Sequence, residues 1–383
     1  MTEAWIVSAT RSPIGRATKG ALIDMRPDDL AAAIVRGALA RVPSLDPNEI
    51  EDVIVGCAQP AGEAGYNIAR AVSLLAGLRD VPGTTVNRYC ASSLQAIRMA
   101  YHAIASGEGD AFVAAGVETV SRFPKGKSDG MPDTKNARFG DGGVQNLYVT
   151  MGETAETVAD REGISRAEMD EFAVRSQERA VAAQKDGLFT NEITPITTPS
   201  GTVVLRDDGP RAGTTVEKLA TLAPVFRPDG RVTAGNACPL NDGAAAVVVM
   251  SDTRAKALGI APRARIVATS VSGLAPEIMG LGPIEATRRV LRRAKKTIAE
   301  IDLVEINEAF AAQVIPSARA LEIPIEKLNV HGGAIALGHP FGMTGARLVT
   351  TLLYALEARG QKTGLATLCV GGGQGMALIL ERP

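Results

Sequence analysis

Cys90 is the residue best suited to do chemistry, because of its neighbours in the sequence. An apolar, strand-like run ends at Val86, and a run with helical spacing of apolar residues covers residues 91–106. A thiol at this junction lies beside unpaired backbone N–H groups at the positive end of a helix, which favours the nucleophilic thiolate. A buried structural cysteine is the alternative for a single cysteine in such a place.

Two distant segments offer partners for this thiol. His339 lies in the glycine-rich stretch 332–347, where glycines let the backbone approach a ligand closely and expose N–H groups. Cys369 ends a small-residue strand before a second glycine-rich turn, so it is either a base or a small buried residue. Asn307 and Glu308 follow a short apolar strand. Glu308 could be a base or a metal ligand, but no matching His or Asp cluster accompanies it, and no metal site is expected.

The composition is that of a large globular protein. The chain has 383 residues, 45% of them hydrophobic, which predicts a large core and two or three domains. The formal net charge of −1 predicts no general attraction to nucleic acid or to an anionic membrane. No secretory signal is expected at the N-terminus, and no run is apolar and long enough for membrane insertion. The four cysteines lack CxxC spacing, and free thiols favour the reducing cytoplasm.

Strand-like and helix-like segments alternate in both end regions, which indicates an α/β fold with covered sheets. The same order of segments occurs twice. Three pairs of segments correspond. A strand-like segment at 48–56 matches one at 299–307, and a second at 112–116 matches one at 365–369. Between them, the helix of 91–106 matches the glycine turn and helix of 338–358. Three pairs in one order favour duplicated halves over a chance matching of amphipathic helices.

A different kind of segment separates the two halves. Residues 121–143 are rich in Gly, Pro, Lys and Asp and predict a long excursion, a kind of loop that is often functional. Helical stretches over 153–162 and 166–185 follow, and residues 242–250 look like a return to the first sheet. The predicted domains are an N-terminal half of residues 1–120 plus 242–262, an inserted loop domain of 121–241, and a C-terminal half of 263–383.

Taken together, these motifs resemble the thiolase family. The segment around Cys90, the Asn-Glu-Ala-Phe-Ala run from Asn307, the Gly-His-Pro segment at His339 and the Cys-x-Gly-Gly-Gly-x-Gly segment at Cys369 occur in family order. The resemblance covers essentially the whole chain. It implies a duplicated fold of α-β-α-β-α layers, with the inserted loop domain covering coenzyme A.

The resemblance also implies acyl transfer through a cysteine thioester. Cys90 would carry the acyl group, His339 would take the Cys90 proton, and Cys369 would remove or return the proton at the α-carbon of acetyl-CoA. One oxyanion hole would consist of the His339 side chain and a water held by Asn307. The other would consist of the backbone N–H groups of Cys90 and Gly371. The expected enzyme is an acetyl-CoA C-acyltransferase that cleaves 3-ketoacyl-CoA to acetyl-CoA and a shortened acyl-CoA, as in fatty acid β-oxidation.

Several alternatives remain open. Biosynthetic condensation to acetoacetyl-CoA would use the same catalytic residues, although Ser93, Phe341 and Met343 look more like degradative thiolases. A ketosynthase-like enzyme would pair its cysteine with two histidines, whereas this chain has Asn307 and Cys369. A cysteine hydrolase would have no role for Cys369. A non-catalytic CoA- or lipid-binding relative would not need to keep the four residues Cys90, Asn307, His339 and Cys369.

The ligand contacts follow from the resemblance alone. Arg211 matches a family position near the nucleotide, and Met151, Ala234 and Phe310 match positions lining the pantetheine channel, although Met151 and Phe310 also suit ordinary core packing. CoA and acyl-CoA would be substrates, with no resident cofactor. The family implies a homodimer, often paired into a homotetramer.

Overall fold

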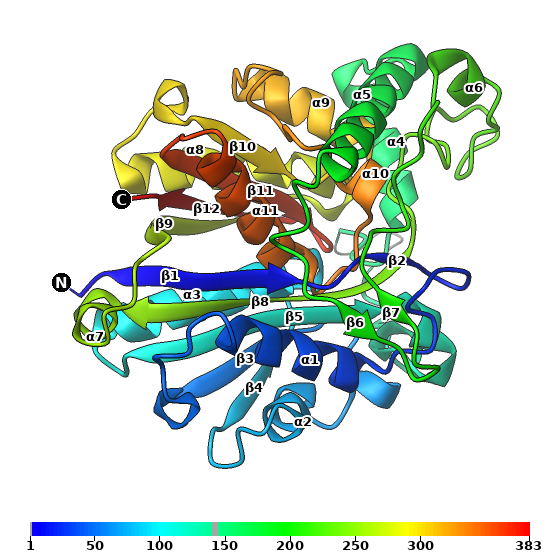
Figure 1. Cartoon of the computed structure of the whole chain (residues 1–383). Coiled ribbons are helices and arrows are strands. Elements are labelled where there is room, and N and C mark those ends of the chain that lie inside the picture. Colours follow the sequence, from blue (N-terminus) through cyan, green and yellow to red (C-terminus); the bar gives the residue numbers. More distant parts are fainter. Residues whose placement is uncertain (1, 140–144) are drawn as a thin grey trace.

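A computed structural model describes residues 2–139 and 145–383, which form one body around a continuous sheet (Figure 1). Within these residues the sheet has ten strands in the order β10-β11-β12-β9-β1-β8-β5-β3-β4, with β2 paired to β8. The strands are β1 (Ala4–Arg11), β2 (Gly15–Arg16), β3 (Asp52–Gly56), β4 (Gly83–Val86), β5 (Ala111–Thr119), β8 (Asn241–Ser251), β9 (Ala264–Gly273), β10 (Leu303–Ile306), β11 (Thr363–Val370) and β12 (Gln374–Glu381). A separate pair consists of β6 (Ile196–Thr197) and β7 (Val203–Val204).

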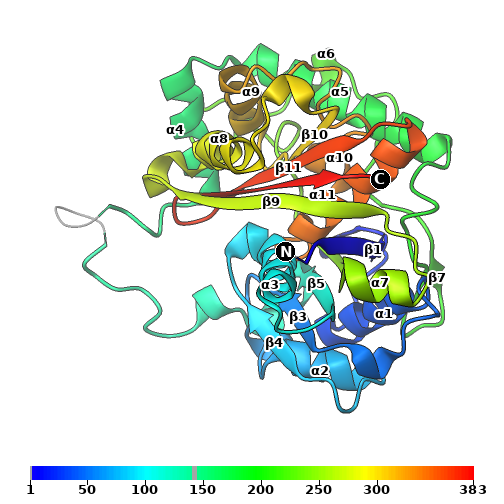
Figure 2. The same cartoon turned by 90° about the vertical axis from the view of Figure 1, so that its left-hand side faces the viewer.

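Helices cover both halves of this sheet and fill the space between them. The α-helices are α1 (Pro27–Leu39), α2 (Ile68–Leu75), α3 (Ser92–Ser106), α4 (Met151–Glu162), α5 (Arg166–Lys185), α6 (Val216–Ala220), α7 (Asp252–Ala257), α8 (Gly282–Ala294), α9 (Ala311–Ala320), α10 (Ala334–Leu337) and α11 (Thr344–Ala358). In Figures 1 and 2, α1 and α2 lie outside the N-terminal strands, α3 and α11 lie between the halves, and α8 lies outside the C-terminal strands. The predicted α-β-α-β-α layering is therefore confirmed.

The two halves have the same strand order and directions, which confirms the predicted duplication. In the N-terminal half, β3 is parallel to β5, which is antiparallel to β8, which is antiparallel to β1. In the C-terminal half, β10, β11, β12 and β9 repeat that pattern. The helices α3 and α11 precede β5 and β11, respectively. The halves join through a short antiparallel pairing of β1 with β9 at Trp5 and Ile6.

The central strands are buried on both faces. Every residue of β8, with the sequence Asn-Asp-Gly-Ala-Ala-Ala-Val-Val-Val-Met-Ser, is buried, and so is every residue of β5. A strand covered on both sides is continuously apolar rather than alternating, and this is why these segments are rich in Ala and Val. The antiparallel pairing with β8 also carries β5 to Thr119, beyond the predicted end at residue 116.

The inserted region projects from the layered body. The segment between β5 and α4 extends away from the rest of the molecule in Figure 2, and residues 140–143 of the predicted excursion lie outside the described residues. The helix α5 begins after Ser165, whose side chain forms a capping box with Glu168, and it has the predicted bounds. The chain returns through β8, which lies between β1 and β5. The domain boundaries themselves stay predictions.

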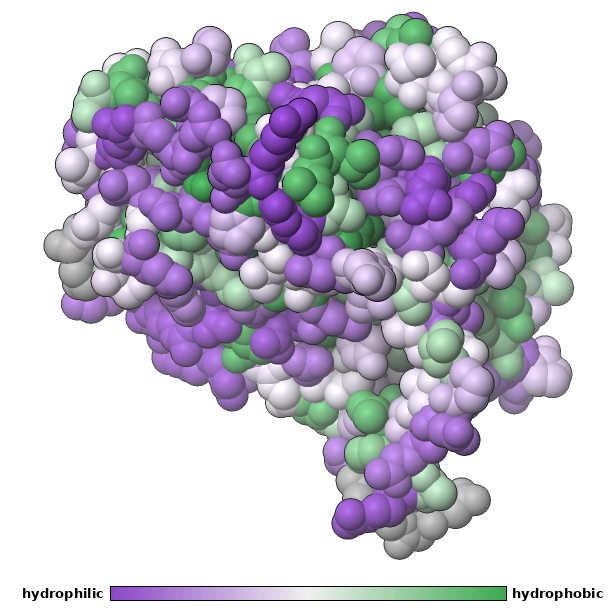
Figure 3. All heavy atoms as spheres, turned by 90° about the horizontal axis from the view of Figure 1, so that it is seen from below, coloured by the Kyte–Doolittle hydropathy of each residue, from purple (hydrophilic) through white to green (hydrophobic). Residues whose placement is uncertain are grey.

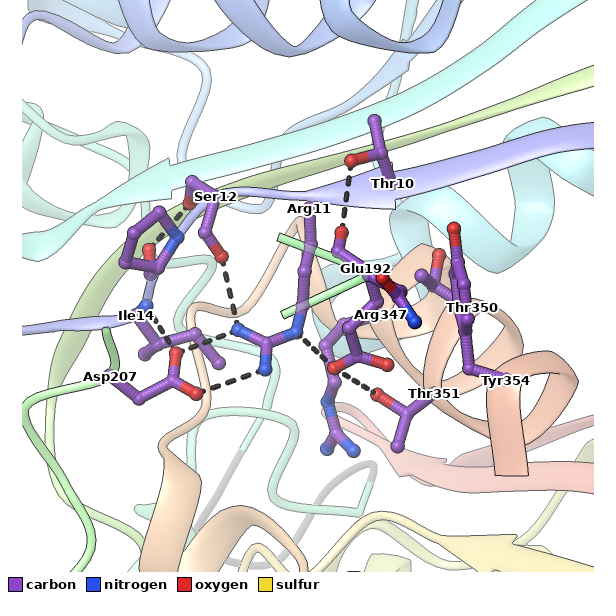
Figure 4. Close-up of polar contacts among 12 residues, drawn as sticks. Thr10, Arg11, Ser12, Ile14, Glu192, Asp207, Arg347, Thr350, Thr351 and Tyr354 are labelled. Atoms are coloured by element: carbon purple, nitrogen blue, oxygen red, sulfur yellow. Dashed lines mark hydrogen bonds and ion pairs between the residues drawn. The ribbon is translucent and has the colours of Figure 1, made fainter. Parts of the chain in front are cut away.

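A buried ionic cluster ties the inserted region to both halves (Figure 4). Arg11, at the end of β1, is fully buried; its Nε donates to Glu192 at 2.6 Å, and its Nη1 and Nη2 donate to Asp207 at 2.7 and 2.9 Å. From α11, the Thr351 hydroxyl donates to Glu192 at 3.2 Å. The bidentate contact satisfies a charge that would be costly to bury unpaired, so the cluster fixes how the three regions meet.

Candidate active site

Cys90 lies in a strained turn between β4 and α3. Tyr89, the residue before it, has a left-handed φ of 43°, a conformation that costs a non-glycine residue about 1–3 kcal/mol. Side chains on both sides stabilise the turn. The Ser92 hydroxyl donates to the Tyr89 carbonyl at 2.6 Å, and Asn87 Oδ1 accepts from the Tyr89 N–H at 2.8 Å. The turn leaves the Cys90 side chain partly exposed to a pocket.

The surroundings of the Cys90 sulfur differ from the sequence-based expectation of a thiolate. Burial raises the pKa of this thiol well above its usual range, and the nearby Cys369 and Glu118 raise it further. The backbone N–H groups of Cys90 and Gly371 point at the sulfur and lower its pKa, but their effect is smaller than that of burial. The preference for thiolate expected from the helix start is therefore overcome, because desolvation disfavours the charge more than the helix end favours it.

Cys369 and Cys238 lie near this sulfur. Cys369 is near the end of β11 and only 1% exposed, and burial raises the pKa of its thiol to about 12, with a smaller contribution from Cys238. Burial, together with Cys90, also raises the pKa of the Cys238 thiol. All three thiols are neutral at physiological pH. The structure thus brings the two predicted cysteines, Cys90 and Cys369, together.

The hydrogen bonds of His339 define its tautomer. Its Nδ1 lies 2.6 Å from the Thr344 hydroxyl, whose one proton goes to the Pro340 carbonyl at 2.7 Å. The hydroxyl must therefore accept from an Nδ1–H group, which leaves the Nε2 lone pair free. Burial lowers the pKa of His339 to about 3, so the ring is neutral at physiological pH. The His339 backbone N–H is held by Asn241 Oδ1 at 3.0 Å, at the start of β8.

Asn307 lies directly after β10 and faces His339. Its Nδ2 lies 3.3 Å from His339 Nε2 and 3.5 Å from His339 Nδ1, so the amide contacts the edge of the ring between its two nitrogens. Its buried Oδ1 has no hydrogen-bond partner among the described residues. The adjacent Glu308 belongs to a different group: it accepts from Ser176 and Asn329 at 2.6 and 2.8 Å, with a structural role. The structure thus brings Asn307 together with His339, as predicted.

Two glycines bring the His339 segment close to the start of the Cys90 helix. A side chain at Gly116 of β5 would collide with the Gly342 carbonyl and with Ser93 at the start of α3. A side chain at Gly342 would lie 2.5 Å from the Val117 carbonyl. Ser93 Oγ also accepts from the Ala346 N–H of α11 at 2.8 Å. The absence of side chains at these two glycines lets the Gly342 segment and the first turn of α11 approach β5 and the start of α3 closely.

Glu118 was not predicted as part of the site, although it supports it. This buried carboxylate accepts from the backbone N–H groups of Ala58, Gln59 and Gly342 at 2.9, 3.2 and 2.9 Å. Burial raises its pKa to about 7, against the effect of these donors. It connects the loop after β3 to the His339 segment. Neither its position nor its spacing from Cys90 marked it in the sequence.

A pocket of about 500 Å³ opens onto Cys90. Phe341, Gly371 and Gly372 line it from the C-terminal half, and Met151 and Tyr148 from the inserted region. Among the predicted CoA contacts, Met151 lines this pocket. Phe310 is buried against Phe226, with ring centroids 6.2 Å apart. Arg211 and Ala234 are exposed and are not part of this lining. A second cavity of about 320 Å³, between α5 and α9, contains none of the predicted site residues.

Two features are absent from the described residues, 2–139 and 145–383. These residues contain no group of three or more His, Cys, Asp or Glu side chains arranged to hold a metal ion. In the same residues, no helix is both long and apolar enough to cross a membrane.

The fold and the site define the class of this protein. Residues 4–253 match the thiolase N-terminal domain and residues 260–382 match the thiolase C-terminal domain. The chain therefore belongs to the thiolase family.

Individual relatives are similar over their whole length. A β-ketoadipyl-CoA thiolase of Acinetobacter baylyi and a 3-ketoacyl-CoA thiolase of Shewanella loihica are each 46% identical, with complete coverage of both chains. The crystal structure of the Bacillus anthracis acetyl-CoA acetyltransferase superposes with a TM-score of 0.92 at 41% identity, covering 100% of this chain and 99% of that one.

Proposed function

We propose that this thiolase is an acetyl-CoA C-acyltransferase that cleaves 3-ketoacyl-CoA with CoA. The observation that carries the proposal is the convergence of Cys90, the Gly371 N–H and the buried Cys369, with Cys90 and Gly371 in the lining of one pocket and a neutral His339 held in a defined tautomer by Thr344. The names of the relatives support the reaction class. They divide between β-ketoadipyl-CoA and general 3-ketoacyl-CoA thiolases at equal identity, so they do not define the acyl group.

The first half-reaction transfers the acyl group to the protein. Cys90 Sγ attacks the 3-keto carbon while its proton passes to His339 Nε2. The bond between C2 and C3 then breaks, and its electron pair forms the enolate of acetyl-CoA. Cys369, a neutral thiol because burial raises its pKa to about 12, gives its proton to C2 and releases acetyl-CoA. The products of this step are an acyl thioester on Cys90 and a thiolate at Cys369.

The second half-reaction returns the protein to its starting state. The CoA thiol gives its proton to Cys369, and its sulfur attacks the acyl carbon on Cys90. The Cys90 sulfur leaves and recovers its proton from His339. Each tetrahedral intermediate and the enolate place negative charge on oxygen. The N–H groups of Cys90 and Gly371 supply one set of donors, and protonated His339 with a water held by Asn307 supplies the other.

Reverse condensation to a longer 3-ketoacyl-CoA uses the same steps backwards and is the second candidate. In both directions CoA and acyl-CoA are substrates, and none of these steps calls for a resident cofactor. We assign the pantetheine channel to Met151, Ala234 and Phe310 and the nucleotide region to Arg211. Free catalytic thiols support a cytoplasmic location.

We also propose that the protein is a homodimer, which further pairing could extend to a homotetramer. The strand β4 ends the sheet order, so one of its edges has no neighbouring strand among residues 2–139 and 145–383. Tyr66, Leu74 and Leu75, from the same part of the fold, are exposed. Apolar side chains beside an open edge favour pairing with a second copy. Light scattering of the purified protein measures the mass directly.

Acyl transfer to Cys90 is the direct test of this function. Incubation with a 3-ketoacyl-CoA in the absence of CoA should add one acyl mass to the peptide containing Cys90, and Cys90→Ser should show none. Cys369→Ala should still acylate at Cys90 with acetyl-CoA but fail to exchange the α-protons of acetyl-CoA. Kinetics should be ping-pong. Acylation at another residue, or full thiolysis by Cys90→Ser, would contradict the assignment.

A further inference from the structure

The part of the Cys90 pocket formed by the projecting segment is lined with cationic and polar side chains. Lys127, Lys135, Asp129 and Tyr148 line the same pocket as Cys90. Two lysines and one aspartate give the described part of this lining one net positive charge. Figure 3 shows hydrophilic side chains, interspersed with apolar ones, on the segment that protrudes from the body. A channel for a purely hydrocarbon chain has no need of this charge.

Gln59 adds a directed donor to this region. Its side chain is 8% exposed and lines the pocket, and its Oε1 accepts from the Ser128 hydroxyl at 2.8 Å and from the Asp129 N–H at 3.0 Å. Because Ser128 and Asp129 hold the oxygen of the amide, its Nε2 is fixed on the opposite side of the amide group. Nε2 donates to no acceptor among the hydrogen bonds of the described residues. This N–H group is therefore open to an acceptor supplied by a ligand in the pocket.

The two lysines differ in how far they are already neutralised. Lys127 Nζ lies 3.3 Å from Asp129 Oδ1, in a pair whose side chains are about half exposed at 44% and 56%. An exposed pair of this kind is weak and can rearrange. Lys135 Nζ lies over the Tyr148 ring, 5.8 Å from its centroid, and has no carboxylate within ion-pair distance among residues 2–139 and 145–383. Lys135 is therefore the cation most available to a ligand.

We propose that this pocket selects 3-ketoacyl groups whose far end carries a carboxylate. Lys135 and Lys127 face that carboxylate, and Gln59 donates a hydrogen bond to it. The inference rests on the thiolase activity proposed above and specifies its substrate class. A hydrocarbon end placed here would desolvate a cation without compensation, whereas a carboxylate would form charge-assisted hydrogen bonds.

The test compares two six-carbon substrates that differ only at the far end. One is 3-ketoadipyl-CoA, which ends in a carboxylate, and the other is 3-ketohexanoyl-CoA, which ends in a methyl group. The wild-type kcat/KM should favour the carboxylate by about tenfold to hundredfold, the range of one to two charge-assisted hydrogen bonds. Because the contact is remote from the reacting carbons, the difference should lie mainly in KM, and it should shrink as ionic strength rises.

Variants of the lysines identify the residues responsible. Lys135→Met and Lys127→Met should each reduce the ratio of the two kcat/KM values, and Lys135→Glu should reverse it. Lys125→Met is the matched control, because Lys125 is exposed on the same segment and does not line the pocket, so the ratio should be unchanged. The monomethyl ester of 3-ketoadipyl-CoA, which has the shape without the charge, should behave like the methyl-ended substrate.

The outcomes separate this inference from the function on which it rests. If both substrates are cleaved with equal kcat/KM, the selection is refuted and the thiolase activity stands. If the carboxylate is preferred but both lysine variants keep the wild-type ratio, the assignment to Lys127 and Lys135 is refuted. If neither substrate is cleaved, and Cys90 is not acylated by any 3-ketoacyl-CoA, the proposed function itself fails.

Discussion

The hydrogen bond between His339 and Thr344 offers a sharp test of how this site works. Thr344 Oγ1 can accept from His339 Nδ1 at 2.6 Å only because its own proton goes to the Pro340 carbonyl. Thr344→Val keeps the shape of the side chain and removes both bonds. The Nδ1–H group and the carbonyl are then buried without partners, and each unsatisfied group costs about 1–3 kcal/mol.

The expected consequence concerns the base. Without the threonine, the Nδ1–H group loses its acceptor, and a proton on Nε2 would block transfer from Cys90. If the variant loses about 1.4 to 2.8 kcal/mol of preference for the productive tautomer, kcat for thiolysis falls about tenfold to hundredfold. Thr344→Ser keeps the hydroxyl and should retain most of the activity. Calorimetric unfolding of both variants shows whether they remain folded.

Nitrogen NMR of labelled protein measures the tautomer itself. The chain has three histidines, so a single His339→Asn variant identifies the signals of this ring. The wild-type spectrum should show a protonated Nδ1 and an unprotonated Nε2 at neutral pH. If Thr344→Val retains wild-type kcat and the same tautomer, then Thr344 does not position the base and the reasoning is wrong.

Three further results are expected. Arg11→Met should lower the free energy of unfolding by about 3–5 kcal/mol in urea titrations, because it leaves the buried Asp207 carboxylate unpaired, and an unchanged midpoint would contradict this. Gly116→Ala should lower the free energy of unfolding by more than about 1–3 kcal/mol, the usual cost of overpacking, because the new methyl group meets the rigid Gly342 carbonyl. A well-folded, fully active variant would show that the two segments can separate. Folding lowers the pKa of His339 from 6.5 to about 3. As pH falls, the His339 ring therefore binds a proton in the unfolded chain before it does so in the folded one. Acidification from pH 6.5 should therefore lower the free energy of unfolding by about 1.4 kcal/mol per pH unit through His339, a slope that His339→Asn should lack in acid titrations.

Local signals in the sequence were enough to place many elements. Ser165 and Glu168 form the capping box that sets the start of α5, and the predicted range of residues 166–185 is the observed one. Other boundaries depended on neighbours. The strand β5 continues to Thr119 because β8 pairs with it that far, and β8 comes from a segment more than a hundred residues away in the chain. Propensity carries no information about such pairing.

The sequence also indicated which residues would meet, because Cys90, Asn307, His339 and Cys369 occur in motifs with a recognisable order. It did not indicate their chemical state. The thiolate expected at Cys90 is a neutral thiol, since burial by residues from both halves outweighs the local effect of the helix end. Glu118 gave no signal either, because its role comes only from the backbone donors that the fold brings around it.

By itself, the sequence determined the duplicated α/β architecture and the types of side chain available for acyl transfer, because both are written in local patterns of apolar, glycine and reactive residues. Only the tertiary structure decided the protonation of the site, the tautomer of His339 and the lining of the pocket beyond Cys90. Each of these depends on desolvation and on hydrogen bonds between segments far apart in the chain. The lysines of the projecting segment show this most clearly, since no local pattern indicates that the fold places them in the same pocket as the nucleophile.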